Sequence, residues 1–155
     1  MTVEIERKFL VTGEDWRARS GPGCDLRQGY LTTNAECTVR VRISGNEAWL
    51  TVKGATSGIS RREFEYAIPL ADAEAMLEVL CPGGLVEKTR HKVQHGSHEW
   101  EVDVFAGANA GLVLAEVELS AENEPFDRPP WVAREVSHDA RYFNAELLRH
   151  PYTSW

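Results

Sequence analysis

The chain has 155 residues, enough for one domain with a substantial core, and its composition is that of an ordinary globular protein with 43% hydrophobic and 26% charged residues. The formal net charge of −7 argues against nonspecific nucleic-acid binding, which depends on a basic surface. No apolar run is long enough to span a membrane as a helix.

The first eleven residues predict a β-strand with two chemically different faces. Read with a period of two, the strand places Glu4, Glu6 and Lys8 on one face, while the opposite face is mainly apolar. Two carboxylates two residues apart on one strand face lie roughly 7 Å from each other, given the rise per residue. On a buried face this arrangement is unfavourable unless a cation lies between them.

The following part of the chain predicts one short helix and four more strands. The helix begins after Thr12 and is ended by the Gly-Pro-rich residues 20–23. The strands have β-type composition and are separated by turn residues; they cover residues 26–33, 37–44, 48–53 and 60–69. The second and third of these form a hairpin about Gly45-Asn46-Glu47.

The rest of the chain predicts three further strands and two helices. Residues 71–80 form the clearest helix of the sequence, and residues 140 to about 149 form another. Strands are expected at 85–94, 98–105 and 112–119, of which the first two form a hairpin about 95–97. About eight strands joined largely by hairpins predict a mainly β (α+β) fold, with an antiparallel sheet that is strongly curved or closed.

Most of these strands repeat the pattern of the first one, with one charged face and one apolar face. Some charged faces are basic and others are acidic, which suggests one sheet surface lined with separate rows of opposite sign. If this surface points inward, the sheet forms a closed antiparallel β-barrel with a polar interior, whose apolar outside is covered by flanking helices or a partner. Such an interior suits a metal-chelated polyanion, because carboxylates bind hard divalent cations while Arg and Lys bind phosphate oxygens.

The ordered series of charged motifs resembles the signature of the CYTH superfamily, the triphosphate tunnel metalloenzymes. The matching motifs span nearly the whole chain: Glu4-x-Glu6-x-Lys8, Arg40-x-Arg42, Lys53, Glu63-x-Glu65, Lys88-x-Arg90, Asp103, Glu116-x-Glu118 and Asp139-Ala-Arg-Tyr-Phe-Asn144. Chain length and the stretch 27–33 are most similar to short bacterial members, which include inorganic tripolyphosphatases. The resemblance implies a single domain over residues 1–155, built as an eight-stranded tunnel that holds a linear triphosphate with Mg²⁺ or Mn²⁺.

The resemblance also implies roles for individual residues. Basic side chains are expected to contact phosphate: Lys8, Arg40, Arg42, Lys53, Lys88 and Arg90. Acidic side chains are expected to hold metal: Asp103, Glu116 and Glu118 for one ion, and Glu4 and Glu6, with or without Glu63 and Glu65, for a second ion or the attacking water. Lys8 and Tyr30 resemble the lysine–tyrosine pair implicated in catalysis in the short bacterial members, so the expected catalytic residues are Lys8, Tyr30, Glu4 and Glu6.

We therefore expect metal-dependent hydrolysis of a phosphoanhydride bond in a triphosphate, with inorganic tripolyphosphate as the first candidate substrate. Thiamine triphosphatase and class IV adenylate cyclase remain alternative activities, and a non-catalytic polyphosphate- or nucleotide-binding module is the alternative outside the enzymes. The N-terminus lacks the basic start and apolar centre of a signal peptide, so a cytoplasmic location is expected. The expected partner is the small-molecule triphosphate, with no nucleic acid and no membrane, and the chain is expected to be a monomer or a homodimer.

Overall fold

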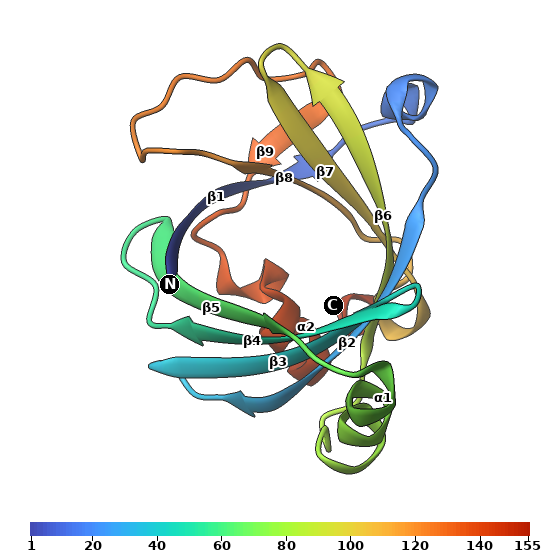
Figure 1. Cartoon of the computed structure of the whole chain (residues 1–155). Coiled ribbons are helices and arrows are strands. Elements are labelled where there is room, and N and C mark those ends of the chain that lie inside the picture. The colour runs from blue at the N-terminus through green and yellow to red at the C-terminus, as the bar shows by residue number, and fades with distance from the viewer.

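The computed structural model describes residues 1–155 and has eight antiparallel strands closed into a barrel, seen end-on in Figure 1. The strands are β1 (Thr2–Val11), β2 (Cys24–Thr33), β3 (Cys37–Ser44), β4 (Glu47–Gly54), β5 (Ser60–Ala67), β6 (Val86–His95), β7 (His98–Phe105) and β8 (Val113–Glu118), with a short ninth strand, β9 (Val132–Glu135). The helices are α1 (Leu70–Val79) and α2 (Asn144–Arg149), with short 3₁₀ helices η1 (Asp15–Arg19), η2 (Gly107–Asn109), η3 (Ala140–Tyr142) and η4 (Tyr152–Ser154). No helix is both long and apolar enough to cross a membrane.

The first strand closes the barrel. The strands follow the order β5-β4-β3-β2-β6-β7-β8-β1, and an additional pairing between β1 and β5 joins the two edges. β1 pairs with β8 through Glu6–Leu10 and with β5 through Thr2–Ile5, while β9 adds to β1 beyond the end of the β5 pairing. The predicted closed antiparallel barrel is therefore confirmed, and closure leaves few unpaired backbone groups at a sheet edge.

Both predicted hairpins are present and turn through two residues. Gly45 connects β3 to β4 with a φ of 58°, and Gly96 connects β6 to β7 with a φ of 59°. A glycine with positive φ at the first central position is typical of the type II′ turn, whose twist matches that of antiparallel strands. These turns set the register, with Ser44 opposite Glu47 and His95 opposite His98.

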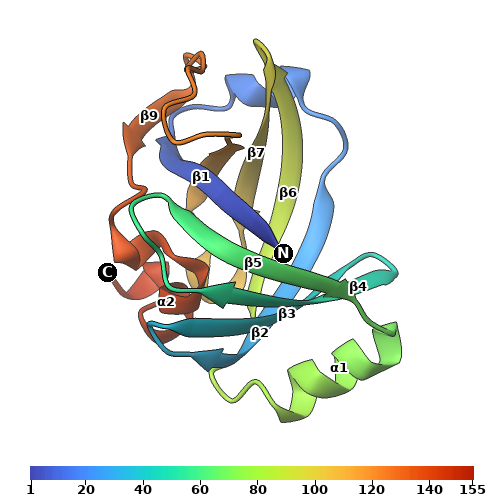
Figure 2. The same cartoon turned by 60° about the vertical axis from the view of Figure 1, so that its left-hand side comes forward.

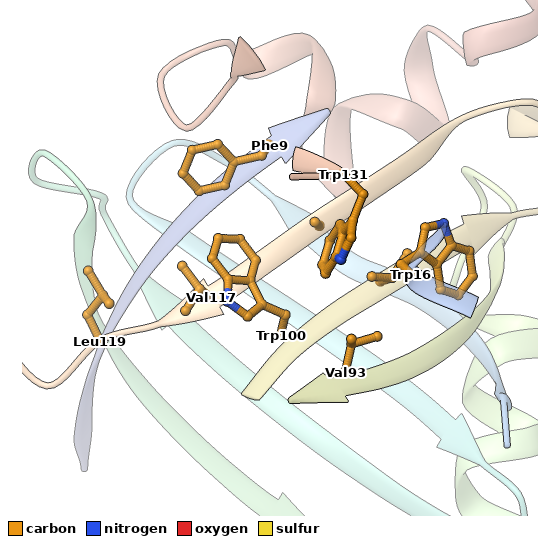
Figure 3. Close-up of a cluster of buried hydrophobic side chains, with 9 residues drawn as sticks. Phe9, Trp16, Val93, Trp100, Val117, Leu119 and Trp131 are labelled. Carbon is orange, nitrogen blue, oxygen red and sulfur yellow. The ribbon is translucent and has the colours of Figure 1, made fainter. Parts of the chain in front are cut away.

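The apolar outer surface of the barrel is covered on two sides. Outside β1, β6, β7 and β8, a cluster of nine buried residues includes three tryptophans, and Figure 3 shows Trp131 between Trp100 and Trp16. Trp16 reaches this cluster from η1, and Trp131 reaches it from the segment before β9. On the other side, α1 packs Ala73 and Leu77 over Val41 of β3. Burying one such large apolar side chain contributes about 1.5–3 kcal/mol to the stability of the fold. The packing of these outer apolar faces therefore keeps the charged faces of the strands inside the barrel.

The inward rows change from charged to apolar at one end of the barrel. On each of four strands, the residue two positions from a charged inward-facing residue, towards this end, is apolar. These residues belong to one buried cluster: Leu10, Val86, Phe105 and Leu114. The fully buried Leu147 of α2 packs into this cluster, so α2 covers the end of the barrel formed by β1, β6, β7 and β8. In Figure 1 the α2 helix is seen through the barrel at its far end, and in Figure 2 it lies beside the ends of β2 and β4.

Two predicted helices differ from the structure. The segment predicted as a helix over 140–149 is divided into η3 and α2, because Phe143 between them is extended with a ψ of 135°. The Tyr142 carbonyl accepts a hydrogen bond from Lys8 Nζ at 3.4 Å, a contact from the far end of the sequence that periodicity cannot reveal. Near the N-terminus, only Asp15–Arg19 is helical, and it is a 3₁₀ helix.

Candidate active site

The inward-facing side chains enclose a polar cavity of about 580 Å³, in which 6 of 28 lining residues are hydrophobic. Nearly all predicted site residues line it: Glu4, Glu6, Lys8, Tyr30, Arg40, Arg42, Lys53, Glu63, Glu65, Arg90, Glu116 and Glu118. The β2–β3 and β4–β5 connections and the start of α2 complete the lining. Because strand residues alternate between faces, the period-two motifs of the sequence converge in this one space.

Lys8 is held at the centre of this site by three groups. Its Nζ lies 3.3 Å from Glu116 Oε1, donates to the Tyr142 carbonyl at 3.4 Å and sits 5.7 Å from the centre of the Phe143 ring. Burial lowers the pKa of Lys8, but the nearby Glu116 and Glu6 carboxylates outweigh burial and raise it above its usual value. Lys8 is therefore a protonated cation in a fixed position.

Lys88 and Asp103 form an ion pair behind the cavity wall. The Lys88 Nζ lies 2.5 Å from Asp103 Oδ2, and neither side chain is exposed. Arg90 donates to both oxygens of Asp103 at 2.8 Å and also pairs with Glu101. Burial, opposed by Asp103, lowers the pKa of Lys88 to about 8. Asp103 thus anchors Lys88 and Arg90 in this arrangement, and its predicted role as a metal ligand stays a prediction.

The two arginines of β3 have different environments. Arg40 donates through Nη2 to Thr51 Oγ1 at 3.2 Å, and the Thr51 hydroxyl donates to Glu65 Oε2 at 2.8 Å. The Nε of Arg40 is buried and has no hydrogen-bond partner within the protein. Arg42 donates through Nε to Gln28, and burial, reinforced by the neighbouring Arg40, lowers the pKa of Arg42 to about 10. A buried N–H without an acceptor is costly, so the Arg40 Nε is a donor that the protein itself leaves unsatisfied.

Glu4 is fully compensated by basic neighbours. Its carboxylate accepts from Lys53 at 2.8 Å and from Arg61 at 2.9 Å, and Lys53 also lies 3.0 Å from Glu63. Burial raises the pKa of Glu4, but the charges of Lys53 and Arg61 outweigh it and lower the pKa to about 2. Glu4 is therefore ionised over the whole physiological pH range.

Glu6, in contrast, is surrounded by other carboxylates. It is the direct cross-strand partner of Glu118, and its pKa is raised to about 8 by burial and by the charges of Glu116 and Glu4. Burial, with Glu4 and Glu63, also raises the pKa of Glu118. No three His, Cys, Asp or Glu side chains gather closely enough to form a metal cluster as they stand. Even so, Glu6, Glu116 and Glu118 supply the oxygen ligands that hard divalent cations prefer, and a cation there would relieve their repulsion.

Three residues of this site were missed by the motif analysis. Arg61 and Glu101 line the cavity, and Gln28 lies behind it between Arg42 and Tyr30. Each of them lies two residues from a predicted site residue on the same strand face. Extending the period-two rows by one position would have found Arg61 before Glu63, Glu101 before Asp103 and Gln28 before Tyr30.

Comparison with known proteins supports the same reading of the chain. A family model described as the CYTH domain matches residues 2–152. A protein of Acetivibrio thermocellus named inorganic triphosphatase is 45% identical over 155 residues, which cover 100% of this chain and 99% of the relative. A protein of the same name from Nitrosomonas europaea is 43% identical over 151 residues, covering 94% of this chain and 96% of the relative.

A solved structure shares the fold. The crystal structure of the inorganic triphosphatase NE1496 aligns with a TM-score of 0.64 and 38% identity, covering 93% of this chain and 96% of that one. Together with the family match over nearly all residues, this likeness agrees with the predicted resemblance. The chain belongs to the CYTH domain family.

Proposed function

We propose that this protein hydrolyses a phosphoanhydride bond of inorganic triphosphate with the help of Mg²⁺ or Mn²⁺. The observation that supports this most is the meeting of acidic and basic rows in one enclosed cavity. Two relatives that are 43–45% identical are named inorganic triphosphatase, which supports the same substrate. Hydrolysis of a phosphoanhydride depends mainly on positioning and charge neutralisation, which such a cavity supplies.

Phosphate binding is assigned to the basic side chains. Arg40 offers its unpartnered Nε, and Arg42 and Arg90 offer guanidinium groups at the cavity wall. Guanidinium groups match phosphate oxygens well, because several N–H donors lie in one plane. Lys53 completes this set within the cavity, whereas Lys88 supports the wall through its pair with Asp103.

Metal binding is assigned first to Glu6, Glu116 and Glu118. Glu6 and Glu118 have raised pKa values and form no ion pair with a basic side chain, and Glu116 adjoins Glu6, whereas Glu4, Glu63 and Glu65 are paired with Lys53, Arg61 or Arg40. A second ion near Glu4 and Glu63 would have to compete with Lys53. When bound, a divalent cation neutralises phosphate charge and polarises the phosphorus–oxygen bond.

The protein's own groups supply the remaining chemistry. The Lys8 ammonium, kept protonated by Glu116 and Glu6, stabilises charge on the transferred phosphoryl group. Tyr30 lines the cavity and its hydroxyl is the proposed donor of a proton to the leaving phosphate oxygen, recovered from the attacking water, and Glu4 is an ionised carboxylate able to orient that water. The predicted catalytic set of Lys8, Tyr30, Glu4 and Glu6 therefore lies in one cavity.

The lining favours an inorganic substrate over thiamine triphosphate or a nucleotide. Its hydrophobic members are three alanines, Ile59, Tyr30 and Phe143. Tyr30 is buried and Phe143 lies near Lys8, so the cavity has no pair of exposed aromatic rings between which a nucleobase or a thiazole could stack. Inorganic triphosphate has no aromatic group and therefore needs no stacking partner in this cavity.

One substrate panel tests the proposal. Purified protein is incubated with tripolyphosphate, ATP, thiamine triphosphate and pyrophosphate, each with Mg²⁺, Mn²⁺ or EDTA, and released phosphate and cyclic AMP are measured. We expect phosphate release from tripolyphosphate that exceeds the other substrates and stops in EDTA. Binding of tripolyphosphate without turnover under all metal conditions would favour the non-catalytic module, and cyclic AMP from ATP would favour the cyclase.

A further inference from the structure

A fully buried glutamine connects two residues of the proposed active site. Gln28 of β2 has 0% exposure and points inward between Leu26 and Tyr30, with Arg42 opposite it on β3 and Val86 opposite it on β6. Arg42 Nε donates to Gln28 Oε1 at 3.0 Å, and Gln28 Nε2 donates to Tyr30 Oη at 3.2 Å. A buried amide is costly unless both of its ends are hydrogen-bonded, and here both are.

The direction of these hydrogen bonds is fixed by chemistry. A guanidinium can only donate, so the atom of Gln28 that faces Arg42 must be the carbonyl oxygen. The other end of the amide is then the NH₂ group, which can also only donate. The Tyr30 oxygen must therefore accept, and its own hydrogen points away from Gln28.

We propose that Gln28 is a positioning residue for triphosphate hydrolysis, because it holds Arg42 and Tyr30 as one unit and keeps a donor on the Tyr30 oxygen. Such a donor stabilises the negative charge that develops on the phenol oxygen when Tyr30 passes its proton to the leaving phosphate oxygen during turnover. Gln28 does not line the cavity, so it acts through Tyr30 and Arg42, which do. The inference rests on the proposed function.

A double-mutant cycle tests this coupling. Gln28→Met keeps the size of the side chain but removes both the donor to Tyr30 and the acceptor for Arg42, so we expect kcat for tripolyphosphate to fall about 10–100-fold, as for loss of a hydrogen bond to a charged group. In a Tyr30→Phe background there is no phenol oxygen to stabilise and only the contact with Arg42 is lost, so the same change should lower kcat by a clearly smaller factor. A merely structural role would lower kcat by the same factor in both backgrounds.

A second variant separates the two ends of the amide. Gln28→Glu keeps an acceptor for Arg42 but has no donor for Tyr30, so it should show the part of the kcat loss that depends on Tyr30 and should have little effect in the Tyr30→Phe background. It serves as the test if Gln28→Met does not fold. Gln94→Met, at an exposed position of β6, is the matched control and should have wild-type kcat. Circular dichroism and thermal unfolding confirm that the variants are folded.

The outcomes distinguish this inference from the function on which it rests. Multiplicative losses in the cycle, wild-type kcat in Gln28→Glu, or full kcat in Tyr30→Phe would each overturn the role of Gln28 while leaving triphosphate hydrolysis intact. A wild-type protein that releases no phosphate from tripolyphosphate would instead overturn the proposed function itself.

Discussion

Lys8 and Glu116 face each other directly across the β1–β8 pair, with Lys8 Nζ 3.3 Å from Glu116 Oε1. The second oxygen of Glu116 lies 3.5 Å from Arg90. Burial raises the pKa of Glu116, but Lys8, Lys88 and Arg90 outweigh it and hold the pKa well below its usual range. One carboxylate therefore orients two cations of the proposed site and is also a proposed metal ligand.

Removing the charge of Glu116 should strongly impair turnover. Glu116→Gln keeps the size of the side chain but weakens both the metal site and the hold on Lys8, so we expect kcat to fall about 10²-fold or more. Initial rates of phosphate release, with saturating Mg²⁺ or Mn²⁺, measure the loss. Near-normal rates in a folded Glu116→Gln protein would refute the metal assignment.

Replacing Arg40 by lysine should mainly weaken substrate binding. Lysine keeps the positive charge but has no counterpart of the unpartnered Nε, so we expect KM for tripolyphosphate to rise about tenfold, since one hydrogen bond to a charged group contributes about 1.5–3 kcal/mol. Steady-state kinetics give KM and kcat. Arg62→Lys, exposed on the same barrel, is the control, and an unchanged KM in Arg40→Lys would contradict the phosphate role.

The metal-free protein should lose stability as the pH rises from about 4.5 towards 8. Burial, Glu116 and Glu4 raise the pKa of Glu6 from 4.5 to about 8, so in this window the folded state binds a proton that the unfolded state has released. Thermal unfolding in EDTA at pH 5 to 7.5 measures the trend, which Glu6→Gln should flatten. The window stops below pH 8 because Lys88, whose pKa is lowered to about 8, has the opposite effect on stability at higher pH.

The loss of stability with rising pH should be smaller when metal is present, because a bound cation favours the ionised form of Glu6. Equal pH dependence in wild type and Glu6→Gln would show that Glu6 does not retain its proton in the folded state. A loss of stability on acidification from pH 7.5 to 5 would contradict the sign.

Asn109 should stabilise the segment that covers the barrel end. This buried side chain donates to the Leu147 carbonyl at 3.4 Å and accepts from the Tyr152 backbone N–H at 2.9 Å, so it connects η2 to α2 and the C-terminal residues. Asn109→Ala leaves those backbone groups without partners and should cost about 1–3 kcal/mol. Urea unfolding measures this, with Asn46→Ala in the exposed β3–β4 turn as the control; equal stability of the two variants would contradict the role.

The barrel was predictable because period-two alternation places whole rows of side chains on one face. Glu4, Glu6 and Lys8 point inward for the same reason that Phe9 packs outward, and a closed sheet brings their rows together. Which inward-facing side chains reach the cavity was not predictable, because this depends on how the strands are aligned with one another. The pairing of Arg90 with Asp103 across β6 and β7 is what places Asp103 behind the wall.

Contacts between distant parts of the chain explain the other differences. The break at Phe143 follows the hydrogen bond from Lys8 Nζ to the Tyr142 carbonyl, which joins residues 134 positions apart. Gln28 was overlooked because it is uncharged, although it has the same strand face as Tyr30. Secondary-structure propensity and charge patterns do not predict such contacts, because contacts between distant residues form only when the barrel closes.

The most direct test of the proposed site is a crystal structure of Lys8→Ala protein with Mn²⁺ and tripolyphosphate, in which anomalous scattering locates the metal. The account predicts manganese bound to Glu6, Glu116 and Glu118, and a triphosphate inside the barrel with an oxygen on Arg40 Nε. Manganese and triphosphate bound outside the barrel, with the acidic and basic rows still paired only to each other, would contradict it.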